Sequence, residues 1–387
     1  MTIATDVSVD GMYEKLKGML SNVVPDVELR YKAKLAVEIN RLKRERNAVI
    51  LGHNYMEPAL YHSVPDFTGD SLELSRQAAR TDKDVIVFCG VKFMAETAKI
   101  LNPTKTVLLP SQKAGCSLAA SITAEDVRAL RRRYPGVPVV TYVNTYADVK
   151  AECDICCTSG NAAKVVQSLG AESVIFLPDE YLARNVARET GKHIIFPALP
   201  LRRTGQAQEL SSSAGIEAGA SPAPTPGPGL APSARTDDTE LDVQPLHGEM
   251  VGWRGRCEVH EKYTVQDITD IRKDYPDVVI LAHPECSPEV TAASDFSGST
   301  SAMIRYIEQS HAPRYLLLTE CSMGDNIAAA HPEKEMLRLC SVRCPHMNQI
   351  TLQDTLASLQ LNQYVIEIPE ETRLRALRSV ERMLAIG

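Results

Sequence analysis

The sequence lacks the features that mark nucleic-acid, nucleotide and membrane partners. It has no basic run, and its 42 Lys and Arg residues against 49 Asp and Glu residues give a net charge of −7. This balance disfavours a nucleic-acid partner or a polybasic contact with a membrane surface. No apolar run approaches the length of a membrane span. Walker A lysine and GxGxxG motifs are also missing, so no motif supports nucleotide binding.

The N-terminal residues also lack the pattern of a secretory signal. Residues 1–20 contain no basic segment followed by an apolar core, so we expect no signal peptide and a cytoplasmic protein. In a reducing compartment the ten cysteines would be thiols, and their spacing then bears on metal or redox chemistry. A chain of 387 residues is too long for one compact core, so two or three domains are expected.

Short apolar runs rich in β-branched residues alternate with helical patterns along the chain. The predicted strands are residues 48–51, 84–89, 106–109, 138–143, 173–177, 193–196, 277–282 and 315–319. The predicted helices are residues 10–47, 72–80, 95–101, 124–134, 162–169, 182–190, 265–275 and 301–310. Strands that are apolar on both faces and joined by helices predict α/β structure with parallel sheets.

Residues 201–246 interrupt this alternation. Their central part is rich in Pro, Ala, Ser and Gly, and it contains no aromatic residue. Such a segment buries too little apolar surface to offset the entropy lost on ordering, so we predict a disordered insertion.

Two sets of landmarks recur at similar intervals along the chain. Polar residues end three predicted strands: His53, Asn144 and His283. Cysteines recur in the same way: Cys116, Cys257 and Cys344. With residues 201–245 left out, the spacings are 91 and 94 residues for the first set, and 96 and 87 for the second. The repeat predicts three similar three-layer αβα domains, each a βαβαβ unit with a parallel sheet, in a pseudo-threefold arrangement around a central active site.

The same repeat predicts the domain boundaries. Domain 1 comprises residues 1–112 and 345–387, with N- and C-terminal helices. Domain 2 comprises residues 113–200 and domain 3 residues 247–344, with the insertion between them.

The three recurring cysteines could converge on one metal centre. Thiolates are soft ligands that select iron–sulfur clusters or zinc, and three cysteines on a cluster leave one iron open to substrate oxygens. Buried structural cysteine is the alternative. Cys257 and His260 have the spacing of half a zinc finger, but no partner pair lies within finger distance.

Shorter cysteine motifs support a hypothesis of a different class, a non-catalytic zinc or redox-sensing metalloprotein. Cys153 and Cys156 have CxxC spacing, and Cys157 follows directly. Cys340 and Cys344 could complete such a site.

Three predicted helices begin with small hydroxyl residues, in segments 69–71, 158–160 and 298–301. Ser71 is the expected N-cap of the first helix, and Thr158 or Ser159 that of the second. Each could be an ordinary cap, but each also offers amides and hydroxyls to phosphate or carboxylate, which suggests a small, multiply anionic substrate. Candidate acids and bases lie nearby: His53, Tyr55, Tyr142, His260, His283 and Glu285.

Longer stretches match one known family over nearly the whole chain from about residue 30, except the insertion. They include GHNYMEPAL (52–60), DFTGDSLELSR (66–76), LLPSQKAGCSLA (108–119), TYVNTYADVKAECDICCTSGNA (141–162), WRGRCEVHE (253–261), AHPEC (282–286), GSTSAMI (298–304) and CPHMNQITL (344–352). In these stretches the sequence resembles the quinolinate synthase family.

The resemblance implies three similar domains around a 4Fe–4S cluster held by Cys116, Cys257 and Cys344. It implies condensation of iminoaspartate with dihydroxyacetone phosphate to quinolinate, releasing phosphate and water, in NAD biosynthesis. The open iron would act as a Lewis acid and assist dehydration. The resemblance does not decide whether the enzyme that makes iminoaspartate passes it directly to this protein. One departure is the CxxxC spacing of Cys340 and Cys344, where some members have CxxC, which argues against a regulatory disulfide.

The resemblance also implies the residues on the substrate side of the cluster. The family assigns acid–base work to the histidine, tyrosine and glutamate positions. The matching residues are His53, Tyr55, Ser71, Tyr142, Asn144, Ser159, His260, His283, Glu285, Ser299, Thr300 and Met347.

Overall fold

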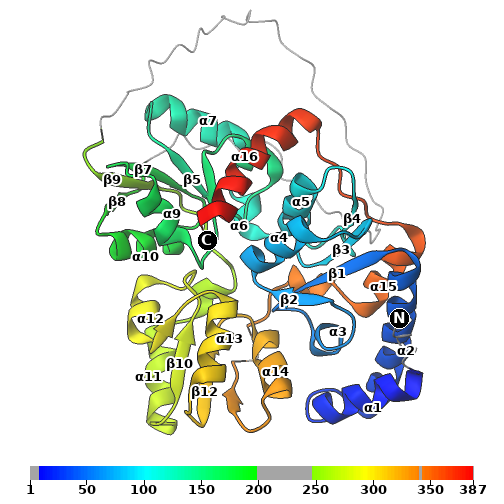
Figure 1. Ribbon diagram of the computed structural model, residues 1–387. Helices are drawn as coiled ribbons and strands as arrows, with labels where there is room; N and C mark the ends of the chain where they lie inside the picture. The colour runs from blue at the N-terminus through cyan, green and yellow to red at the C-terminus, as the bar shows by residue number, and fades with distance from the viewer. Residues whose placement is uncertain (1–7, 198–245, 340–341, 387) are drawn as a thin grey trace, which may run out of the picture.

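The computed structural model describes residues 8–197, 246–339 and 342–386, and it confirms the predicted α/β class (Figure 1). Most of the predicted insertion, residues 201–245, lies outside the described residues. No helix in the described part of the chain is both long and apolar enough to span a bilayer.

Three separate parallel sheets form the framework, with helices packed around each. The first contains, in spatial order, β2 (Phe67–Gly69), β1 (Ala48–His53), β3 (Val85–Cys89) and β4 (Thr106–Leu108). The second contains β6 (Ile155–Cys157), β5 (Val139–Tyr142), β7 (Val174–Leu177), β9 (Glu249–Gly252) and β8 (His193–Ile195). The third contains β11 (Phe296–Ser297), β10 (Val279–Ala282), β12 (Arg314–Leu318) and β13 (Glu335–Leu337).

The three sheets share one order of strands. In each, the first strand lies between the second and third, and a further strand follows on the outer side of the third. In the second sheet this outer position is taken by β9, and β8 is an additional edge strand. All of these pairs are parallel. The shared order explains the repeat seen in the sequence.

All eight predicted strands are present, and five further strands are not among the predictions. The central strands β1, β3, β5 and β7 are buried along their whole length, which is why they read as continuous apolar runs. The missed strands are β2, β6, β9, β11 and β13, which have two to four residues each. Such short segments show no measurable periodicity.

The prediction of one continuous helix over residues 10–47 is wrong, because this segment forms two helices. They are α1 (Val9–Leu20) and α2 (Asp26–Glu45), with Pro25 directly before the second. Proline disfavours helical backbone in the residue before it and lacks the N–H that a continuing helix would need.

The other seven predicted helices are present. They are α4 (Ser71–Arg80), α5 (Lys92–Leu101), α7 (Ala124–Arg133), α9 (Ala162–Ser168), α10 (Glu180–Thr190), α11 (Val265–Asp274) and α13 (Thr300–Gln309). Further helices are α3 (Pro58–Tyr61), α6 (Ser117–Ala120), α8 (Ala147–Ala151), α12 (Pro288–Ala293), α14 (Cys321–Ala330), α15 (Leu352–Leu361) and α16 (Glu370–Ile386). Two short 3₁₀ turns are η1 (His260–Lys262) and η2 (Met347–Gln349).

Two elements cross the predicted domain boundaries. Strand β9 pairs with β7 and β8, so residues 249–252 belong to the second sheet although they fall in the range 247–344 assigned to domain 3. Helix α16 joins the first two units. Ser379 on this helix donates its hydroxyl to Lys150 O (3.0 Å), and Arg373 donates to Ile100 O (3.1 Å).

Candidate active site

Each recurring cysteine follows the outer strand of its unit. Cys116 lies after β4, Cys257 after β9 and Cys344 after β13. A short helical turn begins at or just after each cysteine, and it turns backbone N–H groups toward the sulfur. The donors lie two and three residues after each cysteine: Leu118 and Ala119, Val259 and His260, His346 and Met347. The three cysteines therefore have the same local construction.

The similarity between the three units continues into the helix that follows each cysteine turn. A threonine seven residues after each cysteine caps a helix, with an aspartate three residues further on. The pairs are Thr123 and Asp126 at α7, Thr264 and Asp267 at α11, and Thr351 and Asp354 at α15. The resulting sequence pattern, C-x6-T-x2-D, occurs in all three units and could have been found from the sequence.

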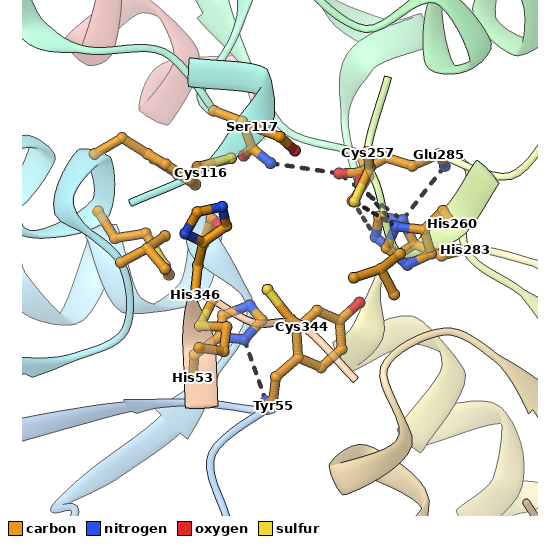
Figure 2. A pocket seen from close by; sticks show the side chains of 18 of the residues that line it. His53, Tyr55, Cys116, Ser117, Cys257, His260, His283, Glu285, Cys344 and His346 are labelled. Atoms are coloured by element: carbon orange, nitrogen blue, oxygen red, sulfur yellow. Dashed lines mark hydrogen bonds and ion pairs between the residues drawn. The ribbon is translucent and has the colours of Figure 1, made fainter. Parts of the chain in front are cut away.

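The three sulfurs face one cavity from three sides (Figure 2). Burial raises the pKa of all three thiols, to about 12 for Cys116 and about 11 for Cys344, and well above the ordinary value for Cys257. The Glu285 carboxylate raises it further for Cys116 and Cys257. Buried thiolates at this position therefore need a cationic group between them.

The same cavity gathers nearly all of the predicted substrate-side residues. Its lining includes His53, Tyr55, Ser71, Tyr142, Asn144, Ser159, His260, His283, Glu285, Thr300 and Met347. Ser299 is not part of this lining. It caps α13, where its hydroxyl accepts from Ala302 N (3.4 Å), and it lines a neighbouring cavity.

Glu285 is the most connected polar group in the cavity. Tyr142 donates its hydroxyl to Oε1 of Glu285 (2.5 Å), and Asn144 donates Nδ2–H to the same oxygen (3.4 Å). His260 Nδ1 lies 2.9 Å from the other oxygen. Burial raises the pKa of Glu285, but the neighbouring His260 ring and these hydrogen bonds outweigh it, so the net shift is downward. The side chain is therefore held as a carboxylate.

His53 and His283 are held alike at equivalent strand ends. The N–H of Tyr55 donates to His53 Nδ1 (3.2 Å), and the N–H of Glu285 donates to His283 Nδ1 (3.3 Å). Burial lowers the pKa of His53 to about 4. Burial and the neighbouring His260 lower that of His283 to about 3. Both rings are thus neutral near pH 7, with the proton on Nε2. In His283 this N–H reaches Ser159 Oγ (3.3 Å).

A chain of hydrogen bonds links Tyr55 to Glu285 through His260. The hydroxyl of Tyr55 lies 2.5 Å from Thr319 Oγ1, which lies 2.8 Å from His260 Nε2. His260 Nδ1 faces Glu285 Oε2, and the ring stacks on His283 with 4.5 Å between centroids. Thr319 was not among the predicted residues, because nothing at the end of β12 marked it as functional.

Several residues of the cavity lining were also missed, and two of them lie close together. His346 and Glu258 both line the cavity, and His346 Nε2 lies 3.0 Å from Glu258 Oε1. Each stands within two residues of a recurring cysteine, so proximity to Cys344 and Cys257 was the available signal.

The predicted caps of two helices are wrong. Asp70, not Ser71, caps α4, accepting from the N–H groups of Leu72 (3.1 Å) and Glu73 (3.0 Å). The carboxylate is the stronger acceptor at a helix N-terminus, and Ser71 is left free to line the cavity. At α9 the N-cap position is Asn161, because residues 155–157 form β6 and the chain turns through residues 158–160 before the helix starts.

The local cysteine motif has the environment of structural cysteine. Cys153 donates to Val149 O (3.1 Å) and Cys156 to Ser379 Oγ (3.4 Å), while Cys157 is fully buried in β6. Burial raises the pKa of all three thiols. Cys340 lies outside the described residues. The zinc half-site therefore has no support from this part of the structure.

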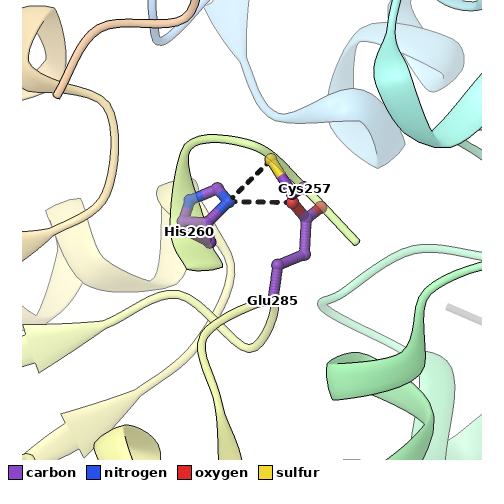
Figure 3. A group of neighbouring side chains, drawn as sticks. All are labelled: Cys257, His260 and Glu285. Atoms are coloured by element: carbon purple, nitrogen blue, oxygen red, sulfur yellow. Dashed lines mark hydrogen bonds and ion pairs between the residues drawn. The ribbon is translucent and has the colours of Figure 1, made fainter. Parts of the chain in front are cut away.

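Only one group of three possible metal ligands is found in the parts of the chain that the structure describes. It comprises Cys257, His260 and Glu285, whose ligand atoms lie within 4.8 Å of one another (Figure 3). His260 Nδ1 lies 3.2 Å from Cys257 Sγ and 2.9 Å from Glu285. These donor types suit zinc as well as iron, so the active-site cavity contains a possible metal site.

The neutral histidines predict a specific loss of stability in acid. The pKa of His53 falls from 6.5 to about 4 on folding, so the unfolded chain binds more protons between these values and stability falls as the pH falls through them. Between pH 6.5 and pH 4, the unfolding free energy of the His53→Gln variant should therefore fall by roughly 3 kcal/mol less than that of the wild type. Denaturant titrations at several pH values measure this.

The matched control is His193→Gln, at an exposed position in β8, which should keep the wild-type dependence. Equal pH dependence in wild type and His53→Gln would contradict the assignment of a buried neutral imidazole.

The fold and the cavity together define an α/β enzyme in which three repeated units enclose one polar site of cysteines, imidazoles and a carboxylate. A family profile described as Quinolinate synthetase A protein matches residues 37–385. Quinolinate synthase 2 of Mesorhizobium japonicum is 51% identical over 345 residues, 89% of each chain. Quinolinate synthase of Agrobacterium fabrum is 45% identical over 385 residues, covering 100% of this chain and 94% of the relative.

A third relative, quinolinate synthase of Xylella fastidiosa, is 48% identical over 348 residues, 90% of this chain and 86% of its own. The chain belongs to the quinolinate synthase family, a family of enzymes of NAD biosynthesis.

Proposed function

We propose that this chain condenses iminoaspartate with dihydroxyacetone phosphate to form quinolinate, with release of phosphate and water. The observation that carries the proposal is the meeting of three identically built cysteine turns with the His53, His283 and Glu285 side chains in one buried cavity. Family membership supplies the substrates, and the cavity supplies groups suited to each part of the reaction.

We further propose that Cys116, Cys257 and Cys344 hold a 4Fe–4S cluster. The fit rests on three converging sulfurs, each receiving backbone N–H groups from its own turn, because such donors stabilise cluster-bound thiolates. When bound, the cluster supplies an open iron that acts as a Lewis acid toward substrate oxygens. His260 stays with Glu285 rather than acting as a ligand, since its Nδ1 hydrogen-bonds the carboxylate.

The substrates carry carboxylate and phosphate groups, and the cavity offers neutral donors to them. Ser71 and Thr300 are the first residues of α4 and α13, where the positive end of the helix dipole favours anions. The Nε2–H of His53 and the hydroxyl of Ser159 add donors from the first and second units. Buried Asn144 Oδ1 has no partner among the described atoms, and a substrate N–H or O–H would satisfy it.

Glu285 is the proposed general base. Its carboxylate is ionised, lines the cavity and already accepts from Tyr142. A proton taken up by Glu285 can be returned to the substrate through a relay. It passes to His260 Nδ1 while the Nε2 proton passes to Thr319 Oγ1, and the Thr319 hydroxyl proton passes to Tyr55, which releases its own hydroxyl proton to the substrate. Tyr55 and Tyr142 keep their protons, because burial and then Glu285 raise both pKa values, so each is suited to act as a hydrogen-bond donor or acid.

Two further proposals concern the surroundings of the enzyme. A cytoplasmic location is proposed, because free thiols and an iron–sulfur cluster persist in a reducing compartment. The enzyme that makes iminoaspartate is a proposed partner. It would supply this substrate either by direct transfer at close range or by release and diffusion.

An anaerobic assay with both substrates tests the proposed function. Purified, cluster-loaded protein is expected to form quinolinate and inorganic phosphate in equal amounts, measured by chromatography and a phosphate assay. Omitting either substrate is the control and should leave both products at background. Cluster-loaded protein that yields no quinolinate under these conditions would overturn the proposal.

A further inference from the structure

A second cavity lies beside the catalytic one, where helices from all three units begin. It is lined by the N-terminal halves of α4, α9 and α13, which lie around the middle of the molecule (Figure 1). Asp70 and Ser159 line both cavities, so the two spaces share a wall. The first and third units also meet there, where the N–H of Asp70 donates to Ser301 Oγ (3.1 Å). A molecule in the second cavity is thus next to the active site.

Three cationic side chains line this second cavity at equivalent positions. Each lies five residues after a hydroxyl residue of the catalytic cavity: Arg76 after Ser71, Lys164 after Ser159, and Arg305 after Thr300. Lys164 and Arg305 are exposed and Arg76 is half-buried. In the part of the chain that the structure describes, none of the three cations has an ion-pair or hydrogen-bond partner. They are therefore available to an anion from outside the protein.

The carboxylates in the same lining do not neutralise these cations by direct contact. Asp70 is engaged as the cap of α4. Glu73 and Glu189 are exposed and form no ion pair with the three cations. Arg188 adds a fourth positive charge, and donates to Pro288 O (3.1 Å) and to Thr291 Oγ1 (3.1 Å).

Asn161 supplies a second, independent sign of a ligand. It lines the second cavity and is 3% exposed, and its Nδ2 group is buried without a partner among the described atoms. Its Oδ1 accepts from Thr158 N (2.7 Å) and Thr158 Oγ1 (3.2 Å), which fixes the amide so that Nδ2 is the free end. Burying an amide donor without a hydrogen-bond partner is unfavourable, so an acceptor such as a phosphate oxygen is expected there.

We propose that the second cavity is an anion-binding vestibule that captures small phosphate or carboxylate compounds and delivers them to the catalytic cavity. The ring of Arg76, Lys164 and Arg305 attracts the anion, and the Asn161 amide holds one of its oxygens. Cations around an opening raise the local concentration of anions and the rate of their association. That the captured molecule is a phosphate-bearing substrate rests on the proposed function. That the second cavity binds anions does not depend on it.

Titration of the cluster-loaded protein with inorganic phosphate in a calorimeter tests the site directly. The triple variant Arg76→Gln, Lys164→Gln, Arg305→Gln should weaken phosphate binding at least about tenfold, because these side chains line only the second cavity. The matched control is Arg80→Gln, an exposed arginine one turn further along α4 that lines neither cavity. It should bind phosphate as the wild type does.

Kinetics provide the second readout. For dihydroxyacetone phosphate, kcat/KM of the triple variant should fall by about an order of magnitude and depend less on ionic strength, while kcat at saturation is retained. Unchanged phosphate binding in the triple variant, or equal weakening in Arg80→Gln, would overturn the vestibule. Normal phosphate binding by a protein that makes no quinolinate would overturn only the proposed function.

Discussion

Cys257→Ser is expected to lose both the visible absorbance of an iron–sulfur cluster and all detectable quinolinate formation. A serine hydroxyl is a hard, weak ligand for cluster iron, and it replaces one of the three cysteine sulfurs that line the cavity. Iron and acid-labile sulfide should fall to background after anaerobic reconstitution. Cys116→Ser and Cys344→Ser should behave alike, because the three cysteine turns are built alike.

Cys153→Ser is the matched control for the cluster. Cys153 is buried like the proposed ligands, but its thiol donates to Val149 O (3.1 Å), a hydrogen bond that a serine hydroxyl can also form. This variant should keep full iron, sulfide and activity. If Cys153→Ser lost the cluster and Cys257→Ser retained it, the ligand assignment would be wrong. Stoichiometric zinc without sulfide in the wild type would favour the metal-sensing alternative.

Glu285→Gln is expected to lower kcat by about 10²–10⁴-fold while leaving the cluster intact. Glutamine has nearly the same shape and can still accept from Tyr142, but it carries no charge and cannot take up a proton. Because the loss concerns a proton transfer rather than binding, kcat should fall much more than KM changes. Anaerobic steady-state assays, with iron and sulfide analysis of the same samples, measure both quantities.

Glu261→Gln is the control for the loss of a negative charge near the site. Glu261 lies in the 3₁₀ turn η1 beside His260, but its side chain is exposed. This variant should keep wild-type kcat and cluster content. Wild-type kcat in Glu285→Gln would remove Glu285 from the role of base. A loss of cluster in that variant would instead indicate a metal-binding role within the Cys257, His260 and Glu285 group.

The sequence predicted the strands that are buried on both faces. Residues 48–51 and 84–89 became β1 and β3 because continuous apolar runs of that length fit only the middle of a covered parallel sheet. It did not predict β9, since four residues emerging from a long polar segment carry no periodicity. Only its pairing with β7 and β8 decides that β9 joins the second sheet.

Local chemistry decided some details against the simplest prediction. Ser71 was the expected cap of α4, but the neighbouring Asp70 accepts two amides and displaces it from that role. Pro25 divides the N-terminal helical pattern in two, which the amphipathic spacing by itself did not indicate.

The sequence by itself determined the class of the fold, the threefold repeat and the recurrence of three cysteines, because each shows in the order and spacing of residues along the chain. Only the tertiary structure decided which side chains meet. The relay from Tyr55 through Thr319 and His260 to Glu285 joins residues from distant parts of the chain. The vestibule joins Arg76, Lys164 and Arg305 from three helices. Contacts between separate units depend on how whole sheets pack, and no local pattern records that packing.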